Sequence, residues 1–345
     1  MFSRVFYLYK TMKKILLLIV FIAAAFLQSL SAQTPEELHE KARGFMRQAD
    51  YANAVLILSR SLQQNPGNIE VAKDLAQSYY FQNNNAQALA VIKPILDNSN
   101  ADDQCYQIAG NIYRQLEERK ELEKLYKKGL KRFPASGPLY NEAGEFYFAD
   151  KKYNDAVKNW EKGIMADPSY SRNYYNAARY YFLTTDKIWS IIYGEMFVNM
   201  EPIGNKTTEM KQVLLNSYKK LFAPPGISKT AYAKNNFIKT YLDVLNRQAA
   251  KAAGGITPET LNLIRTGFIT DWFATANRPA FRLFEHQQQL INEGMFEAYN
   301  QWLFGTVSNP DAYSNWVKLH PAEYNSFAAF QKAKLFKVPA GQNYR

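Results

Sequence analysis

The chain has 345 residues, of which 47% are hydrophobic, so it is long enough for more than one folded unit and too apolar to be largely disordered. Its formal net charge is +11, but basic residues are scattered among acidic ones, even in the densest basic run at 124–132. This pattern is typical of a solvated helix face and does not indicate a nucleic-acid-binding protein. The single cysteine, Cys105, excludes an intramolecular disulfide and a cysteine-based metal site.

Residues 1–32 have the pattern of a cleaved signal peptide. Lys13 and Lys14 precede an apolar run over 15–27, and small residues lead to Ala32, after which we expect cleavage. The run is only about 13 residues long, whereas a membrane-spanning helix needs roughly 20. A retained membrane anchor is the alternative, and the start codon is either Met1 or Met12. We therefore expect an exported protein of the periplasm or cell envelope, or a secreted one.

From about residue 35 to residue 203, five successive stretches repeat the same residue types at a step of 34. The approximate units are 35–68, 69–102, 103–136, 137–170 and 171–204. Position eight of each unit holds a small residue, namely Ala42, Ala76, Gly110, Gly144 or Ala178. Position eleven holds an aromatic residue, namely Phe45, Tyr79, Tyr113, Tyr147 or Tyr181. Small residues let two helices approach closely, so each unit is predicted to be a helical hairpin that buries its apolar stripe by stacking on the next.

This pattern resembles the tetratricopeptide repeat (TPR). A helix-stopping proline near the end of four units, at Pro66, Pro134, Pro168 and Pro202, strengthens the resemblance. The resemblance implies an all-α fold, with a solenoid of about five hairpins that binds a protein or peptide on its concave face. The fifth unit departs from the pattern at Ser190 and Gly194, so we expect its second helix to tilt or to shift by one residue.

Two further segments follow the repeats. Helical spacing over 207–222 predicts a capping helix, and a second helix is predicted over 229–252, so that 205–255 forms a cap and linker. Residues 256–345 are rich in aromatic residues and are predicted to form a compact helical domain. Its aromatic side chains either fill its own core or line a ligand cleft. Part of this region, 281–304, resembles carboxy-terminal regions of exported repeat proteins of uncharacterised role in Bacteroidetes-type bacteria, which implies no activity.

The sequence contains no pattern typical of a catalytic or metal site. The three histidines, His39, His286 and His320, lack a second ligand at metal-binding spacing. No nucleophile elbow or phosphate-binding glycine loop is present. Acids such as Asp271, Glu285, Glu293 and Glu297 could form a carboxylate pair, but spacing in sequence does not show that they converge. We therefore predict a chain that is not an enzyme and needs no cofactor.

The TPR resemblance also implies which residues line the concave face. Positions two, five, nine and twelve of each first helix usually point into it. Here they include Arg43, Lys73, Gln77, Tyr80, Asn111, Arg114, Asn141, Glu145, Phe148, Arg172, Tyr175 and Arg179. Basic and amide groups suit an extended backbone or an acidic tail, and the aromatic rings offer anchoring area. These residues do not reproduce the lysine and asparagine arrangement of the family's best-known carboxylate clamp.

We therefore predict a noncatalytic scaffold or adaptor of the cell envelope that binds a protein segment along its repeats. The alternative is an enzyme or small-ligand binder whose site lies in the aromatic carboxy-terminal region, with the repeats recruiting the substrate. A third hypothesis is that the repeats mediate self-association alone. The sequence identifies neither the partner nor the process that the protein serves.

Overall fold

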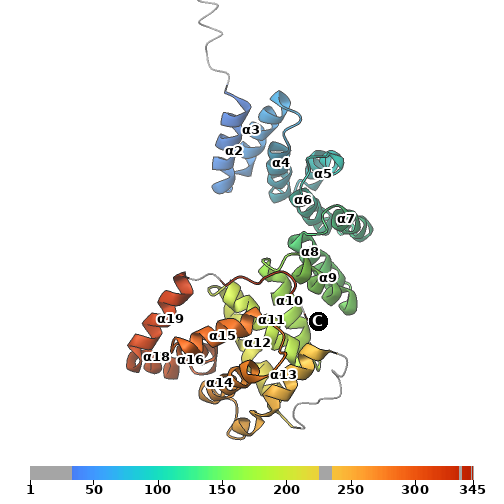
Figure 1. Ribbon diagram of the computed structural model, residues 1–345. Helices are drawn as coiled ribbons and strands as arrows, with labels where there is room; N and C mark the ends of the chain where they lie inside the picture. The colour runs from blue at the N-terminus through green and yellow to red at the C-terminus, as the bar shows by residue number, and fades with distance from the viewer. Residues whose placement is uncertain (1–32, 225–234, 334–335, 343, 345) are drawn as a thin grey trace, which may run out of the picture. The chain divides into compact units, whose positions relative to one another are not determined.

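The structure is a computed structural model that describes residues 33–224, 235–333, 336–342 and 344 (Figure 1). The predicted signal peptide and residues 229–234 of the predicted linker helix lie outside this part of the chain. All regular secondary structure in the described residues is helical, which confirms the predicted all-α fold. None of the described helices combines the length and the apolar character that a membrane-spanning segment needs.

Ten helices form the five predicted units. They are α2 (Pro35–Arg47), α3 (Tyr51–Gln64), α4 (Ile69–Phe81), α5 (Asn85–Ile92), α6 (Asp103–Gln115), α7 (Arg119–Arg132), α8 (Gly137–Ala149), α9 (Tyr153–Ala166), α10 (Ser171–Leu183) and α11 (Lys187–Met200). Each first helix begins 34 residues after the previous first helix, and each second helix does the same. The shift expected for the second helix of the fifth unit is wrong, because α11 begins at Lys187, in register with the others.

The turn between the two helices repeats with the same period. Ala49, Asn83, Glu117 and Lys151 have φ between 58° and 60°, in the left-handed region. This conformation lets the amide of the next residue donate to the carbonyl of the aromatic residue at position eleven, as from Lys152 N to Tyr147 O at 2.9 Å. The fifth turn is different: Thr184 is extended, and the Lys187 Nζ donates to the carbonyls that end α10.

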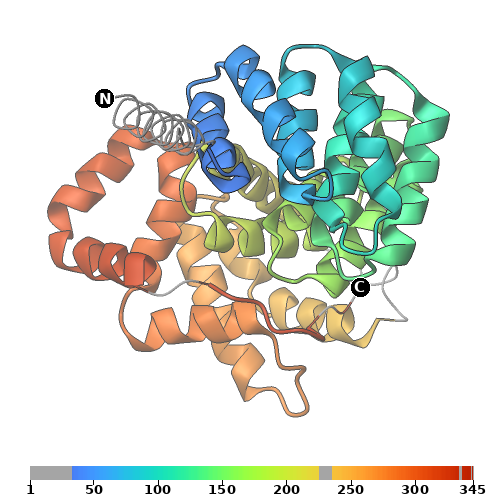
Figure 2. The same ribbon diagram turned by 90° about the horizontal axis from the view of Figure 1, so that it is seen from above.

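The chain divides into two compact units. The boundary in the sequence falls between Arg119 and Lys120, inside the third repeat. In unit 1, the hairpins α2–α3 and α4–α5 pack around Ala42, Ala54, Leu58, Val71 and Leu75. Figure 2 shows the helices of this unit, coloured from blue to blue-green, packed one after the next. A short 3₁₀ segment, η1 (Lys93–Asp97), continues α5.

Unit 2 contains α8 to α11 and all the helices that follow. The predicted capping helix is α12 (Asn205–Phe222), which begins 34 residues after α10 and packs on α11. The remaining elements are α13 (Asn236–Asn246), η3 (Ala249–Ala252), α14 (Pro258–Ala274), α15 (Arg282–Asn292), α16 (Phe296–Asn300), the π-helix η4 (Gln301–Gly305), α17 (Thr306–Ser308), α18 (Pro310–Leu319) and α19 (Pro321–Ala333).

One hydrophobic core runs through unit 2, from Ala156 in α9 to Phe336 near the end of the chain. The ring of Trp189 in α11 stacks at 6.1 Å on Phe237 in α13, and Phe237 in turn contacts Trp272 in α14 at 5.7 Å. The last residues join this core, since the ring of Tyr344 stacks on Phe237 at 4.5 Å. The repeats therefore share their core with the aromatic carboxy-terminal helices, and the predicted domain bounds near 204 and 255 stay predictions.

A buried polar network ties α11 to the carboxy-terminal helices. Glu195, which is 1% exposed, forms an ion pair with Arg265 of α14. Its Oε1 also accepts hydrogen bonds from Gln287 Nε2 at 2.6 Å and from the Tyr299 hydroxyl at 2.8 Å. Arg265 donates a further bond to Asn300. Since a buried charge is tolerated only when it is paired and hydrogen-bonded, these contacts fix how the carboxy-terminal helices pack on the last repeat.

A buried lysine makes a second link between α12 and the carboxy-terminal helices. The Nζ of Lys211 donates to the Trp302 carbonyl at 2.8 Å and lies 3.8 Å from the centre of the Trp302 ring. Trp302 belongs to the π-helix η4, a short segment of a kind that is rare in proteins. Burial lowers the pKa of Lys211 from 10.5 to about 7, because water no longer solvates its charge.

Replacing Lys211 tests how much the burial of its charge lowers the free energy of unfolding. With a folded pKa of about 7 and an unfolded pKa of 10.5, the stability that Lys211 contributes is fully present above pH 10.5 and is lost as the pH falls towards 7. We expect Lys211→Met to be more stable than the wild type at pH 7, with the advantage shrinking by about 1.4 kcal/mol per pH unit towards pH 9. Urea unfolding at several pH values measures this difference. The exposed Lys219→Met is the control, and parallel pH profiles of the wild type and Lys211→Met would contradict the assignment.

A second test concerns the left-handed turn. Glycine adopts positive φ without the steric cost that Lys151 bears at 59°, so Lys151→Gly is expected to raise the free energy of unfolding by about 1 kcal/mol. Thr185→Gly, at the equivalent place in the fifth turn, is the matched control, because Thr185 has no positive φ whose steric cost a glycine would remove. Thermal unfolding of both variants checks the prediction, which fails if the two substitutions have the same effect.

Candidate functional site

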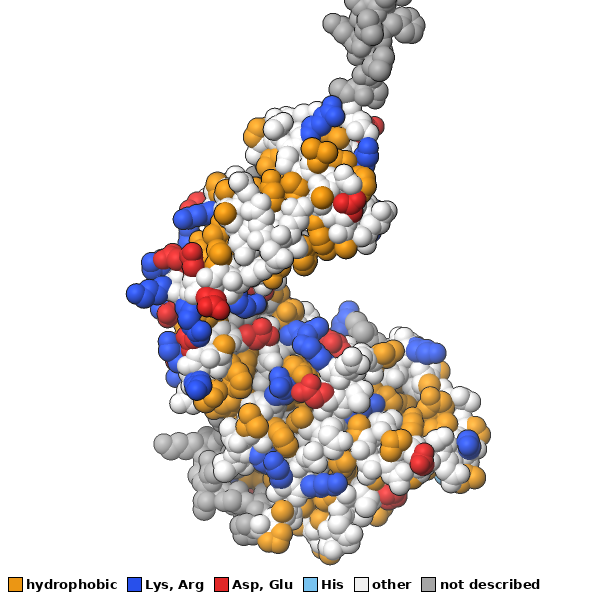
Figure 3. All heavy atoms as spheres, turned by 180° about the vertical axis from the view of Figure 1, so that it is seen from behind, with side chains coloured by type: hydrophobic (Ala, Val, Ile, Leu, Met, Phe, Trp, Pro, Cys, Tyr) orange, Lys and Arg blue, Asp and Glu red, His pale blue; other side chains and the backbone are white. Residues whose placement is uncertain are grey.

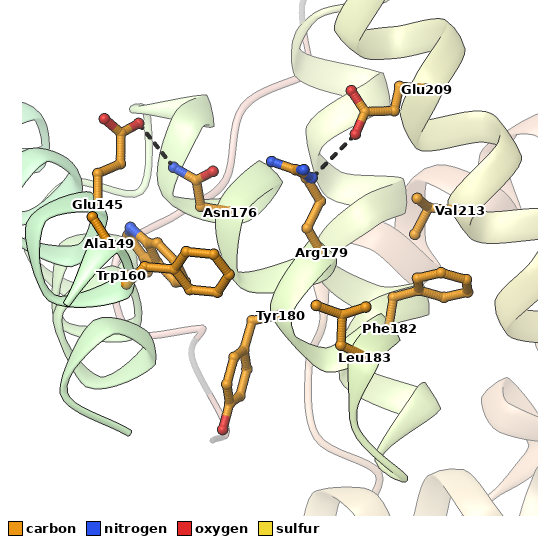
Figure 4. Close-up of a pocket in the computed structure, with 11 residues that line it drawn as sticks. Glu145, Ala149, Trp160, Asn176, Arg179, Tyr180, Phe182, Leu183, Glu209 and Val213 are labelled. Carbon is orange, nitrogen blue, oxygen red and sulfur yellow. Dashed lines mark hydrogen bonds and ion pairs between the residues drawn. The ribbon is translucent and has the colours of Figure 1, made fainter. Parts of the chain in front are cut away.

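A groove of about 450 Å³ opens in unit 2 beside α10, and we call it the α10 groove (Figure 4). Helices α8, α9, α10 and α12 contribute its walls. Its lining residues are Glu145, Phe148, Ala149, Trp160, Asn176, Arg179, Tyr180, Phe182, Leu183, Glu209 and Val213. Five of these come from α10, whose position is set by the shared core described above.

The floor of the groove is apolar and open to solvent. Phe148 is 37% exposed and Leu183 is 73% exposed, although both side chains are large and hydrophobic. The Phe148 ring contacts Trp160 at 5.8 Å and Tyr153 at 5.1 Å, so it is held on one side by other aromatic rings. Grouped exposed apolar side chains of this kind are typical of a surface that binds a ligand or another protein.

Polar side chains lie along the edge of this floor. Arg179 Nε pairs with Glu209 Oε1 at 3.1 Å, and the Tyr175 hydroxyl donates to the other oxygen of Glu209 at 2.6 Å. Asn176 Nδ2 donates to Glu145 at 3.3 Å (Figure 4). Burial, followed by the hydrogen bond to Glu209, raises the pKa of Tyr175 to about 12, so its hydroxyl stays a neutral donor. The edge thus offers donors and acceptors that suit a peptide backbone.

The small residue of the fourth repeat makes room for the aromatic floor. A Cβ at Gly144 would lie 2.2 Å from Nε1 of Trp160, well inside contact distance. The same Nε1 donates to the Asn141 carbonyl at 3.3 Å. Glycine at position eight is therefore required for Trp160 to sit against α8 and to line the groove.

A second recess of about 650 Å³ adjoins the α10 groove. The two share Phe148, Tyr180 and Leu183, and the recess extends past the left-handed turn at Lys151 to Tyr153. An occupant that crosses these three shared side chains would contact both. The combined surface therefore suits an extended chain better than a compact small molecule.

The twelve residues predicted for the concave face are divided between the two units. In unit 2, Glu145, Phe148 and Arg179 line the α10 groove, and Tyr175 contacts its edge through Glu209. Asn141 is buried and accepts from Asn176 at 2.8 Å. The remaining one, Arg172, pairs with Glu201 at 3.7 Å.

In unit 1, the six other predicted residues are Arg43, Lys73, Gln77, Tyr80, Asn111 and Arg114. Lys73 is 3% exposed, and its Nζ lies 2.6 Å from carboxylates of Glu70 and Asp102. Arg43 bonds to Asp74 at 3.0 Å, and Arg114 donates to Asn111 at 3.2 Å. Gln77 and Tyr80 are partly exposed. The basic side chains among the six are thus engaged in contacts within unit 1.

Most of the predicted polar residues share one structural use. They bond to a residue on the next first helix, about one repeat further along the chain, as in Arg43 to Asp74, Lys73 to Asp102 and Tyr175 to Glu209. These side chains therefore hold neighbouring repeats in register. Phe148 differs from these residues, because its exposed side chain carries no polar group.

Sequence reasoning missed much of the groove. Asn176, Tyr180 and Leu183 lie one step further round α10 than the predicted positions, and Trp160 comes from a second helix. Glu209 and Val213 belong to α12, which the sequence predicts only as a cap. Extending the step of 34 from Tyr175 leads to Glu209, so the repeat itself contained the signal that the first helix of a sixth unit continues the groove.

The surface charges do not form a field of one sign on the face drawn in Figure 3, where basic and acidic side chains are interspersed. In the densest basic run, Lys124 pairs with Glu121 at 2.7 Å and Lys127 with Glu123 at 2.8 Å. The run therefore contains partly neutralised, exposed pairs.

Comparison with known proteins agrees with this architecture. Residues 45–112 match the family described as "Tetratricopeptide repeat". A crystal structure of a thermophilic TPR protein from Thermus thermophilus is similar over 53% of this chain and 100% of its own, with 14% identity and a TM-score of 0.44.

Two MamA structures are also similar. One covers 50% of this chain and 94% of its own, with 17% identity and a TM-score of 0.38. The other, MamA from Desulfovibrio magneticus, covers 52% of this chain and 94% of its own, with 12% identity and a TM-score of 0.39. No curated protein matches the chain in sequence.

In the enzyme alternative, the carboxy-terminal region would contain the active site. Over the described residues, no group of three His, Cys, Asp or Glu side chains is placed to hold a metal ion. His286 is 6% exposed and packs against the rings of Tyr299, Phe330 and Phe336. The cavity beside Glu195 and Arg265 has a volume of about 10 Å³, which is room for a water molecule and not for a substrate.

Adding a methyl group at position eight tests how the groove is built. Gly144→Ala is expected to displace Trp160 and to lower the free energy of unfolding of unit 2 by about 1–3 kcal/mol, because the added Cβ overlaps the indole. Trp160 fluorescence should shift as the ring moves. Gly44→Ala, where the new Cβ meets only the end of Arg47 at 3.8 Å, is the matched helical control and should not destabilise the chain. Equal effects of the two substitutions would contradict the assigned role of Gly144.

Proposed function

We propose that this protein is a noncatalytic scaffold that binds an extended segment of a partner protein in the α10 groove. The observation that carries the proposal is the exposed apolar floor formed by Phe148 and Leu183 beneath a hydrogen-bonding edge. Apolar side chains of the segment would bury this floor, at a gain of about 25 cal/mol per Å² of apolar surface. Asn176 and Arg179 would bond its backbone.

The expected compartment extends this proposal. We propose that the chain acts at the cell envelope after export, because residues 1–32 have the pattern of a signal peptide. Amino-terminal sequencing of the protein purified from its native envelope fraction would test this, since the mature chain should begin at Gln33.

No observation in the described residues favours the enzyme alternative over the scaffold. The polar groups that converge in the carboxy-terminal region bond to one another in the Glu195–Arg265 network, which holds helices together. Self-association remains a separate hypothesis, which light scattering of the mature chain decides.

Selection of peptides tests the groove directly. We expect the mature chain to select peptides with large apolar side chains from a random phage-displayed library. Truncation of the floor in Phe148→Ala/Leu183→Ala should weaken binding of the selected peptides by about tenfold or more, since each truncation removes apolar contact area. Fluorescence anisotropy with labelled peptides measures the affinity.

Leu263→Ala is the control for this experiment, because Leu263 is 58% exposed on α14, outside the groove. Its affinity for the selected peptides should match that of the wild type. If the double variant binds the peptides as tightly as the wild type, the α10 groove is not the binding surface.

A further inference from the structure

Two lysines from different helices meet at one end of the α10 groove. The Nζ of Lys220, in α12, lies 4.1 Å from the centre of the Phe182 ring, and the Nζ of Lys187, in α11, lies 5.6 Å from it. Phe182 itself lines the groove. An occupant that extends past Phe182 therefore comes near two positive charges.

The position of Lys187 is fixed by the way α10 ends. Its Nζ donates to the Phe182 carbonyl at 2.6 Å and to the Thr184 carbonyl. Burial, and then the charge of Lys220, lowers the pKa of Lys187. The two ammonium groups therefore repel each other, and a negative charge placed beside both would relieve that repulsion.

The chain's own acidic groups, over the residues that the structure describes, do not neutralise this end. Asp186 lies beside Lys187 and offsets part of its charge. On the neighbouring face of α12, Glu209 is already bonded to Arg179 and Tyr175. Lys220 forms no ion pair with a carboxylate of any described residue. Its charge thus lies exposed at the Phe182 end, directly next to the apolar floor.

We propose that the segment bound in the α10 groove carries an acidic side chain one or two residues away from its main apolar anchor. The anchor lies on Phe148 and Leu183, and the carboxylate lies between Lys187 and Lys220 at the Phe182 end. In an extended chain, such a spacing covers roughly 3–7 Å, and Leu183 of the floor and Phe182 beside the lysines are consecutive residues of α10. This inference rests on the proposed function, because it assigns a chemistry to the occupant of the same groove.

The two lysines have different consequences for specificity. Lys220 is exposed and bonds to no backbone group among the described residues, so changing it alters the charge without removing a helix cap. Lys187 also holds the end of α10, so its replacement would disturb the fold as well. Lys220 is therefore the position at which charge can be tested alone.

The test uses one peptide selected on the wild-type groove and two analogues of it. In these, each acidic residue near the anchor is changed to its amide or to lysine. We expect the acidic form to bind the wild type roughly fivefold more tightly than the amide form, as for an exposed charge pair. The preference should fall as salt is raised, because exposed charges are screened.

Lys220→Glu should remove the preference for the acidic peptide and favour the lysine analogue. Lys219→Glu, at the exposed neighbouring position of α12, should keep the wild-type preference. Circular dichroism confirms that both variants are folded. The inference is overturned if the acidic and amide peptides bind the wild type equally, or if both variants lose the preference to the same degree.

These outcomes are separable from failure of the proposed function. If the peptides lose affinity for Phe148→Ala/Leu183→Ala but show no charge preference, the groove binds segments and only the acidic requirement is wrong. If the floor variant has no effect, the proposed function itself fails.

Discussion

The close approach of two helices at position eight of each repeat is the contact on which the rest of the structure depends. Ala42, Ala76 and Ala178 are fully buried at this position, and at Gly144 even a methyl group has no room. Since every pair closes at the same point, each helix starts 34 residues after its counterpart. The same contact sets Trp160 beneath Phe148, so the constraint that builds the repeat also builds the floor of the α10 groove.

Holding repeats in register and binding a partner compete for the same side chains. A buried cation such as Lys73 must be paired, and its two carboxylate partners together with Gln104 occupy the three N–H donors of its ammonium group. Tyr175 is similarly engaged by Glu209. What remains available in unit 2 is apolar surface that no neighbouring described helix covers. Under the proposed function, recognition in the α10 groove depends on Phe148 and Leu183, with the polar groups at its edge fixing the backbone of the occupant.

Helix starts, hairpin pairing and the capping helix were predictable from sequence, because each depends on local spacing around small residues such as Ala76 and Gly144. The left-handed turns at Ala49, Glu117 and Lys151 were not, since none of these residues favours positive φ; the repeat imposes it. Periodicity shows that a helix buries one face, but it does not show which helix covers that face. The contact between Trp189 and Phe237 in the shared core could therefore not be predicted. Eight of the eleven residues that line the groove were missed for the same reason.

The shared core explains why the groove lies where it does. A binding surface needs a rigid base, and α10 and α12 are held from behind by α11, whose Glu195 is fixed by Arg265 of α14. An isolated repeat array would leave α12 supported on one side only. Here the carboxy-terminal helices supply the other side through Lys211 and Trp302. In unit 2, the aromatic carboxy-terminal region thus fixes the helices that line the groove, and under the proposed function it supports recognition in this way.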